Sequence, residues 1–233
     1  DFVVAGFEKV TASSVVKYLP DMSEAYEGTE SICDFFDMMI KEEQCYLLNS
    51  PCFKLFRRSL IAEKSISFVE GLSYAEDKLF VFSVMAKCSS IKTFAGDVYA
   101  YYMRPGSLGS DISSDKHLQQ LYVFLPLYAS VLSAIVERCP NTPKVLGLYR
   151  KDLIGRYICR MLNVYTTRRT KMLTRDNVSA LYQMMTEDKG LGIFSLRVGQ
   201  VFNLLLYKIG KPRFTVAVYK LTAFVSSIFR KRK

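Results

Sequence analysis

Two neighbouring carboxylates, Glu76 and Asp77, lie at the predicted start of a helix over residues 75–88. A carboxylate can serve as a general base when it lies within hydrogen-bond reach of a hydroxyl proton. Acidic residues in the first turn also stabilise a helix, because they complement its dipole. The pair by itself therefore predicts either a catalytic base or plain helix capping.

Basic residues form a second cluster, with Lys54, Arg57 and Arg58 in the segment FKLFRRSLI. The guanidinium group of arginine suits bidentate binding of phosphate or carboxylate. A solvated helix face would have the same composition, so the cluster by itself leaves both interpretations open.

A third cluster, YYMRPGSLGS, holds Arg104 and Ser107 in a turn-rich loop. Such a loop can present a guanidinium and several backbone N–H groups to an anion, or it can be an ordinary surface loop. Its spacing matches neither a Walker loop nor a dinucleotide fingerprint. His117 is the only histidine, so neither a metal site nor a Ser/His/Asp triad is predicted.

The order of these clusters resembles the second half of the catalytic domain in bacterial family 2 glycosyltransferases. In that family a KLYRR segment precedes a segment with the pattern F-x-E-G-L-x-Y-x-E-D, and a tyrosine-rich segment ending in R-x-G-S follows. Here residues 54–58 read KLFRR, residues 68–80 read FVEGLSYAEDKLF and residues 99–107 read YAYYMRPGS. The resemblance covers residues 1 to about 110.

The resemblance implies a GT-A fold, a nucleotide-sugar donor, a saccharide or lipid-linked acceptor and inversion at the anomeric carbon. The matching base is Asp77, and Glu76 would orient it or contact the acceptor. The remaining matches are substrate-binding: Arg104 and Ser107 by the donor phosphates or the mouth of the site, and Lys54 and Arg57 near the acceptor cleft.

The first half of the family pattern, which includes the strands that hold the nucleotide base, is absent. So are the D-x-D carboxylates that hold Mg²⁺ or Mn²⁺, because Asp34 and Asp37 have two residues between them and lie in a predicted helix. We therefore expect no metal ligands in this chain and impaired donor binding by the chain alone, and the catalytic expectations refer to a longer parent. The alternative is a non-catalytic, membrane-associated or scaffolding remnant that has lost donor binding.

Hydrophobic periodicity predicts a mixed α/β fold with two regions. Residues 1–112 would form a sheet with helices, which the resemblance implies is part of a GT-A-like sheet, and residues 113–233 would form an all-helical region. The expected elements of the first region are a strand over 2–7, a helix over 29–48, a loop and short helix over 50–64, a turn at Glu70–Gly71, a helix over 75–88 and two short strands over 89–102 separated by Gly96–Asp97.

The chain has six cysteines, and no two of them form a C-x-x-C pair. Most lie in apolar runs, which predicts buried, reduced thiols. Reduced thiols in turn predict a reducing compartment.

The net charge of +10 resides at the C-terminal end of the chain. Residues 189–233 contain ten of the 32 basic residues and no acidic residue, and the other 22 basic residues balance the 22 acidic ones. No apolar stretch there reaches the length of a membrane span, and its charges alternate with Leu, Val and Phe. The segment therefore predicts helices that lie on an anionic membrane surface, or that pack on the core, and not nucleic-acid binding.

A basic interfacial tail would place the protein in the cytoplasm, peripheral to the inner face of the cell membrane. Each basic group near an anionic surface contributes about 1 kcal/mol of binding. We expect sedimentation with vesicles that contain anionic lipid and loss of binding as salt increases. Absence of binding to such vesicles at low salt would refute the membrane assignment.

Overall fold

The computed structural model describes residues 1–41, 44–103 and 115–139, all of which belong to one compact unit, Asp1–Gly147. Several predictions lie outside these residues: the contacts of Arg104 and Ser107, the helical prediction beyond residue 139, and the basic segment 189–233. The predicted domain boundary near residue 112 also falls among them and stays a prediction.

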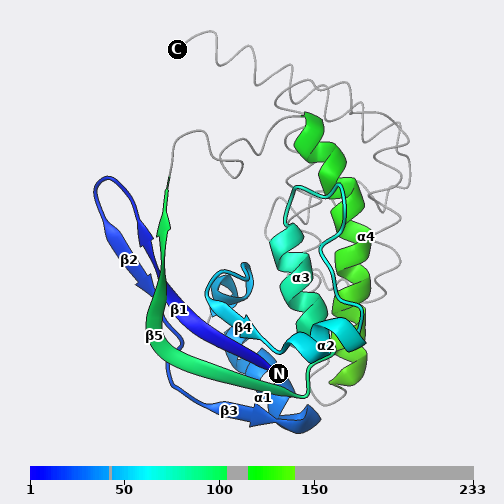
Figure 1. The fold of residues 1–233 in the computed structure, drawn as a ribbon, viewed down its shortest axis with the longest axis horizontal. Coiled ribbons are helices and arrows are strands. Elements are labelled where there is room, and N and C mark those ends of the chain that lie inside the picture. The colour runs from blue at the N-terminus through cyan, green and yellow to red at the C-terminus, as the bar shows by residue number, and fades with distance from the viewer. Residues whose placement is uncertain (42–43, 104–114, 140–233) are drawn as a thin grey trace, which may run out of the picture. The chain divides into compact units, whose positions relative to one another are not determined.

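A curled, mixed, five-stranded sheet forms the centre of the unit (Figure 1). The strand order is β2-β1-β5-β3, and β4 also pairs with β1. Strands β1 and β5 run parallel, whereas the other pairs are antiparallel. The strands are β1 (Phe2–Val10), β2 (Val15–Tyr18), β3 (Ala25–Glu27), β4 (Lys54–Phe56) and β5 (Ser90–Tyr102).

The first half of β1 is the best covered part of the sheet, because β4 and β5 flank it. Phe2 and Val4 are almost completely buried there. Beyond Gly6, β1 and β5 continue together and are less buried. The strand predicted over residues 2–7 is thus confirmed, and its extension to Val10 supplies a partly open sheet face.

The prediction of two short strands over residues 89–102 is wrong, because β5 is one continuous strand of 13 residues. Gly96 and Asp97 do not form a turn between strands. They lie where the register with β1 shifts, from Ala5 opposite Phe94 to Gly6 opposite Asp97. Both halves of β5 pair with the same parallel strand, so extra residues are absorbed as an irregularity in the ladder.

Helices pack on the sheet and on one another, and this packing positions the first turn of α3. The structure contains α1 (Gly28–Lys41), the 3₁₀ helix η1 (Gln44–Leu48), α2 (Arg58–Glu63), α3 (Glu76–Met85) and α4 (Asp115–Arg138). The predicted helix over 29–48 is confirmed as far as Lys41, and 3₁₀ geometry follows near its end. The helix over 75–88 and the turn at Gly71, where φ is +75°, are also confirmed.

Helix α3 is buried around most of its circumference, including Leu79, Phe80 and Phe82. It packs against α4, where Phe82 meets Tyr128 edge to face with ring centroids 5.2 Å apart. On the other side, Phe80 stacks on Phe68 at 4.4 Å and meets Phe56 at 5.4 Å. A helix that is apolar all round must be enclosed in this way. The enclosure fixes the position of its first turn, where Glu76 and Asp77 lie.

A disulfide joins Cys33 on α1 to Cys139, which directly follows α4. The prediction of reduced thiols is therefore wrong for these two residues. The two cysteines are 106 residues apart, so no local spacing pattern reveals their pairing. Disulfides persist mainly in oxidising compartments, and this bond thus counts against the reducing compartment expected from the sequence. Cys52 and Cys88 are free thiols, the first exposed and the second buried.

Candidate functional site

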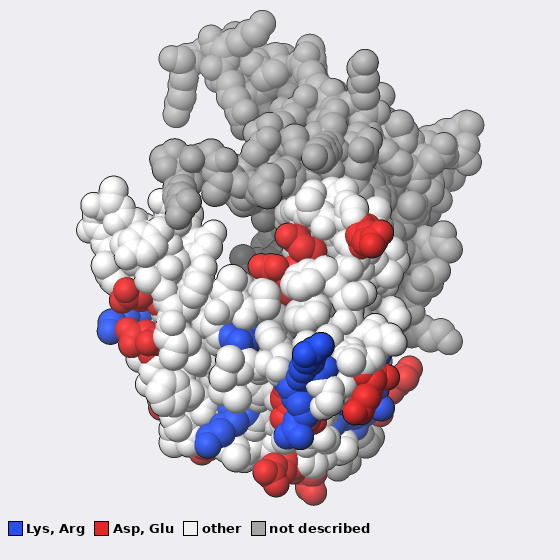
Figure 2. All heavy atoms as spheres, viewed as in Figure 1, with Lys and Arg blue, Asp and Glu red and all other residues white. Residues whose placement is uncertain are grey.

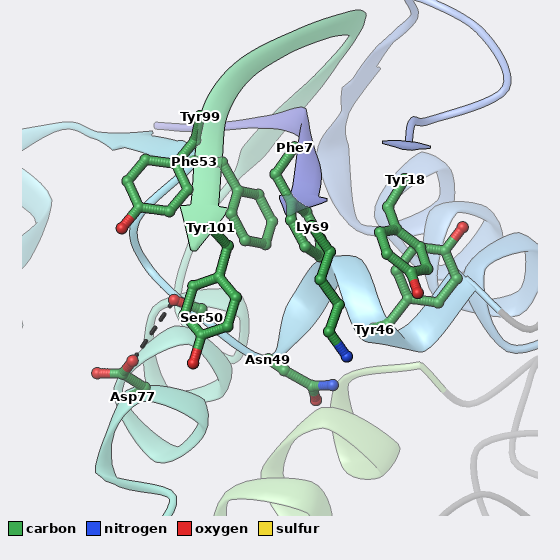
Figure 3. Close-up of a pocket in the computed structure, with 10 residues that line it drawn as sticks. All are labelled: Phe7, Lys9, Tyr18, Tyr46, Asn49, Ser50, Phe53, Asp77, Tyr99 and Tyr101. Atoms are coloured by element: carbon green, nitrogen blue, oxygen red, sulfur yellow. Dashed lines mark hydrogen bonds between the residues drawn. The ribbon is translucent and has the colours of Figure 1, made fainter. Parts of the chain in front are cut away.

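A cavity of about 500 Å³ lies between the extended ends of β1 and β5, the segment after η1 and the start of α3 (Figure 3). Figure 2 shows the surface hollowed between the sheet side and the helical side, with charged atoms in small separate groups. The lining residues are Phe7, Lys9, Tyr18, Tyr46, Asn49, Ser50, Phe53, Asp77, Tyr99 and Tyr101.

Six of the ten lining residues are aromatic, and strand register brings most of them together. Residues at alternate positions on a strand share a face, so Phe7 and Lys9 lie on one side of β1 and Tyr99 and Tyr101 on the same side of β5. Tyr18 is the β2 partner of Phe7, and their rings stack with centroids 4.9 Å apart. The result is an aromatic wall on one side of the cavity.

The turn after η1 completes this wall. Phe53 is buried and stacks on Phe7 with ring centroids 4.5 Å apart. Its carbonyl accepts a hydrogen bond from the backbone N–H of Ala5 at 3.1 Å, which ties the turn to β1. Asn49 and Ser50 precede it and bring polar groups to the cavity.

Within the part of the chain that the structure describes, Asp77 brings the only carboxylate to the cavity lining. It is half-buried in the first turn of α3, where its carboxylate accepts a hydrogen bond from the Ser50 hydroxyl at 3.4 Å. The N-cap residue of α3 is Ala75, which has a positive φ of 55° and no side chain that could cap. The Asp77 side chain thus contacts the cavity wall, in addition to any favourable effect on the helix dipole.

The ionisation of Asp77 reflects this setting. Burial raises the pKa of its carboxyl above the ordinary value, and the neighbouring charge of Glu76 raises it further. The hydrogen bond from Ser50 and the positive charge of Lys54 oppose the increase. A base is most effective when its pKa approaches the working pH, so this environment suits proton abstraction.

Lys54 lies behind the cavity wall and is not among the residues that line it. It is only 8% exposed; its ammonium donates to the carbonyl of Ser50 and lies 3.7 Å from the centre of the Phe53 ring. Burial lowers the pKa of Lys54 to about 7, although Cys52 and Asp77 act in the opposite direction. Lys54 therefore holds the turn that carries Ser50, and its charge also acts on Asp77.

The other predicted site residues lie apart from the cavity lining. Arg57 forms an ion pair with the carboxylate of Asp1 at 3.0 Å, and that carboxylate also accepts hydrogen bonds from Ser89. Glu76 is half-exposed beside Asp77 without lining the cavity. The structure describes four of the predicted site residues. It places Asp77 in the cavity lining and Lys54 at the turn that supports this lining, whereas the other two lie outside the lining.

The sequence interpretation missed most of the cavity. Tyr99 and Tyr101 stand two residues apart in the tyrosine-rich motif, and this alternation could have assigned them to one face of a strand. Lys9, Asn49 and Ser50 carry no comparable signal, because their approach to Asp77 depends on tertiary packing.

In the described part of the chain, no three or more His, Cys, Asp or Glu side chains are grouped so that they could hold a metal ion. None of the described helices combines the length and the apolar character needed to cross a membrane.

Comparisons of the chain with protein-family models, with curated proteins and with solved structures found no match. The functional interpretation therefore depends on the sequence motifs and on the geometry of the cavity.

The buried amine of Lys54 leads to a prediction about stability and pH. The unfolded chain binds more protons than the folded protein between pH 7 and the ordinary lysine pKa of about 10.5, so stability should rise with pH in that window. One such group contributes at most about 1.4 kcal/mol per pH unit. We expect Lys54→Met to remove this rise and to be more stable than the wild type near pH 7.

Chemical denaturation between pH 6 and 10 measures this effect. Lys92→Met, which alters an exposed lysine on β5, is the matched control and should leave the slope unchanged. Equal slopes for the wild type and Lys54→Met would show that the Lys54 amine does not change its protonation on folding.

Proposed function

We propose that the chain carries the acceptor half of the active site of an inverting, GT-A-like glycosyltransferase of family 2, acting in cell-surface polysaccharide or glycolipid synthesis. The observation that supports this most strongly is the half-buried carboxylate of Asp77 on an aromatic-lined cavity, hydrogen-bonded to Ser50. The donor would be a nucleotide sugar, and the acceptor a saccharide or a lipid-linked saccharide.

Asp77 acts as the general base in this proposal. It accepts the proton of the acceptor hydroxyl while that oxygen attacks the anomeric carbon of the donor sugar. The bond to the nucleoside diphosphate breaks on the opposite face, so the configuration inverts. Ser50 orients the carboxylate and Lys54 supports Ser50 from behind, while Glu76 raises the basicity of its neighbour.

The composition of the cavity suits a sugar ring. Aromatic faces such as those of Tyr18 and Tyr101 can pack against the apolar C–H face of a pyranose, and Asn49 and Ser50 offer hydrogen-bonding groups to its hydroxyls. A volume of about 500 Å³ lies within the ordinary range of small-molecule sites.

Other parts of the proposal rest on the sequence resemblance. Arg104 and Ser107 would contact the donor phosphates. A divalent cation, Mg²⁺ or Mn²⁺, would neutralise the leaving diphosphate, held by D-x-D carboxylates that this chain does not contain. The basic residues of segment 189–233 would hold the protein at the cytoplasmic face of the membrane, near a lipid-linked acceptor.

A transfer assay tests the proposal. The protein encoded by the longest open reading frame that contains this chain is incubated with nucleotide sugars, saccharide acceptors and Mg²⁺ or Mn²⁺. We expect a glycoside whose anomeric configuration, read by NMR, is opposite to that of the donor. Retention of configuration would contradict the role of Asp77, and saccharide binding without transfer is the result expected of a non-catalytic remnant.

A further inference from the structure

Lys9 is the only cationic residue among the described residues that line the cavity. It is half-buried on β1, opposite Tyr101 of β5 and Val16 of β2. Figure 3 shows its side chain directed across the cavity, with the amine beside Asn49. The sequence motifs gave no role to this residue.

The charges of the neighbouring strands do not neutralise Lys9. Glu8, the adjacent residue, lies on the opposite face of β1, as expected from strand alternation. On that face Asp97 forms an ion pair with Lys17. Among the described residues, no carboxylate forms an ion pair with Lys9, so its ammonium offers a charge-assisted donor to the contents of the cavity.

Asp77 places a negative charge on the same cavity, and Glu76 adds a second one beside it. These carboxylates repel an anionic group and Lys9 attracts it. An anionic ligand therefore has one favourable orientation, with its charge at Lys9 and its uncharged hydroxyls at Asp77. The aromatic wall between them suits the apolar face of a sugar ring.

We infer that the cavity binds an acidic saccharide, in which Lys9 pairs with a carboxylate or phosphate on the sugar while Asp77 meets the hydroxyl that reacts. This inference rests on the proposed function and specifies its acceptor. Lys9 determines specificity in this arrangement, because a neutral sugar of the same shape leaves the ammonium without its partner.

Binding of matched sugars to the full chain tests the inference. The probes are methyl glucuronide, its neutral counterpart methyl glucoside, and glucose 6-phosphate, each titrated and followed by ligand-observed NMR. We expect each anionic sugar to bind about 10-fold more tightly than the glucoside, which corresponds to one charge-assisted hydrogen bond of about 1.4 kcal/mol. Lys9→Met should abolish the preference and Lys9→Arg should retain it.

Lys17→Met is the matched control, because Lys17 lies on the opposite sheet face and pairs with Asp97. It should leave both affinities unchanged. Equal affinity for charged and neutral sugars, or a preference that survives Lys9→Met, would overturn the role of Lys9 and leave a saccharide site intact. Failure of every sugar to bind would overturn both the inference and the proposed acceptor site.

The donor diphosphate is the competing anion, and uridine diphosphate serves as its probe, titrated into the protein that the longest open reading frame containing this chain encodes. We expect its affinity to be unchanged in Lys9→Met. Loss of nucleotide binding in this variant, without any preference for acidic sugars, would assign Lys9 to the donor and overturn the inference.

Discussion

Asp77→Asn is expected to reduce sugar transfer by about 10²–10⁴-fold, the usual contribution of a general base. The amide has the size and shape of the carboxylate and can still accept a hydrogen bond from Ser50. It cannot take the proton from an acceptor hydroxyl. The loss should therefore appear in the rate of the chemical step, with saccharide binding retained. The transfer assay and a binding titration on the same variant measure the two effects separately.

A measurement of stability distinguishes a catalytic defect of Asp77→Asn from misfolding. Because burial raises the pKa of Asp77 in the folded protein, the folded chain binds more protons than the unfolded chain between the ordinary and the raised pKa. Stability contributed by this group is therefore lost as pH rises through that window. At neutral pH the asparagine removes a poorly solvated charge, and we expect Asp77→Asn to be at least as stable as the wild type.

Asp97→Asn is the matched control, since Asp97 is exposed and pairs with Lys17 on the outer sheet face. It should retain full transfer activity. Undiminished transfer by Asp77→Asn would show that another group is the base, and an equal loss in both variants would point to a general effect of removing a carboxylate.

Removal of the Cys33–Cys139 disulfide is expected to lower the free energy of unfolding by about 2–5 kcal/mol. The bond closes a long loop, with 106 residues of sequence separation, and so restricts the unfolded chain strongly. It also ties α1 to the end of α4, which packs on α3. Denaturant unfolding of the Cys33→Ala/Cys139→Ala double variant, compared with the oxidised wild type, measures the loss.

Two single variants control for the loss of a thiol. Cys52→Ala removes an exposed free cysteine and should be neutral, whereas Cys88→Ala removes a buried one and should cost only its packing. Addition of a reductant should destabilise the wild type and both single variants, which all keep the disulfide, and should leave the double variant unchanged. If the double variant is as stable as the oxidised wild type, the cross-link makes no contribution.

The disulfide indicates an oxidising compartment, whereas the proposed cytoplasmic location is reducing. Mass spectrometry of protein alkylated in cells distinguishes the two. A Cys33–Cys139 pair indicates an oxidising compartment and opposes the cytoplasmic assignment, whereas alkylation of both thiols shows that the bond is absent in the cell.

The sequence predicted those elements whose signal is local. The apolar run of 79–86 behind two acidic residues predicts α3, and the apolar start of the chain predicts β1. The same local signal places Asp77 in the first turn of a helix. Each of these features depends on neighbouring residues only, and tertiary packing reinforces it.

Features that depend on distant pairing could not be predicted. Gly96 and Asp97 look like a turn, but parallel pairing with β1 makes them an irregularity within β5. The three residues of β4 are recognisable as a strand only because β1 lies beside them. The disulfide and the approach of Lys9 to the cavity likewise join segments that no sequence pattern connects.

The most direct test is the structure of the chain with a bound saccharide. The account predicts a sugar ring packed on the wall that includes Tyr18 and Tyr101, with one hydroxyl within about 3 Å of the Asp77 carboxylate. A sugar bound elsewhere, or one bound in the cavity with no hydroxyl near Asp77, would contradict it.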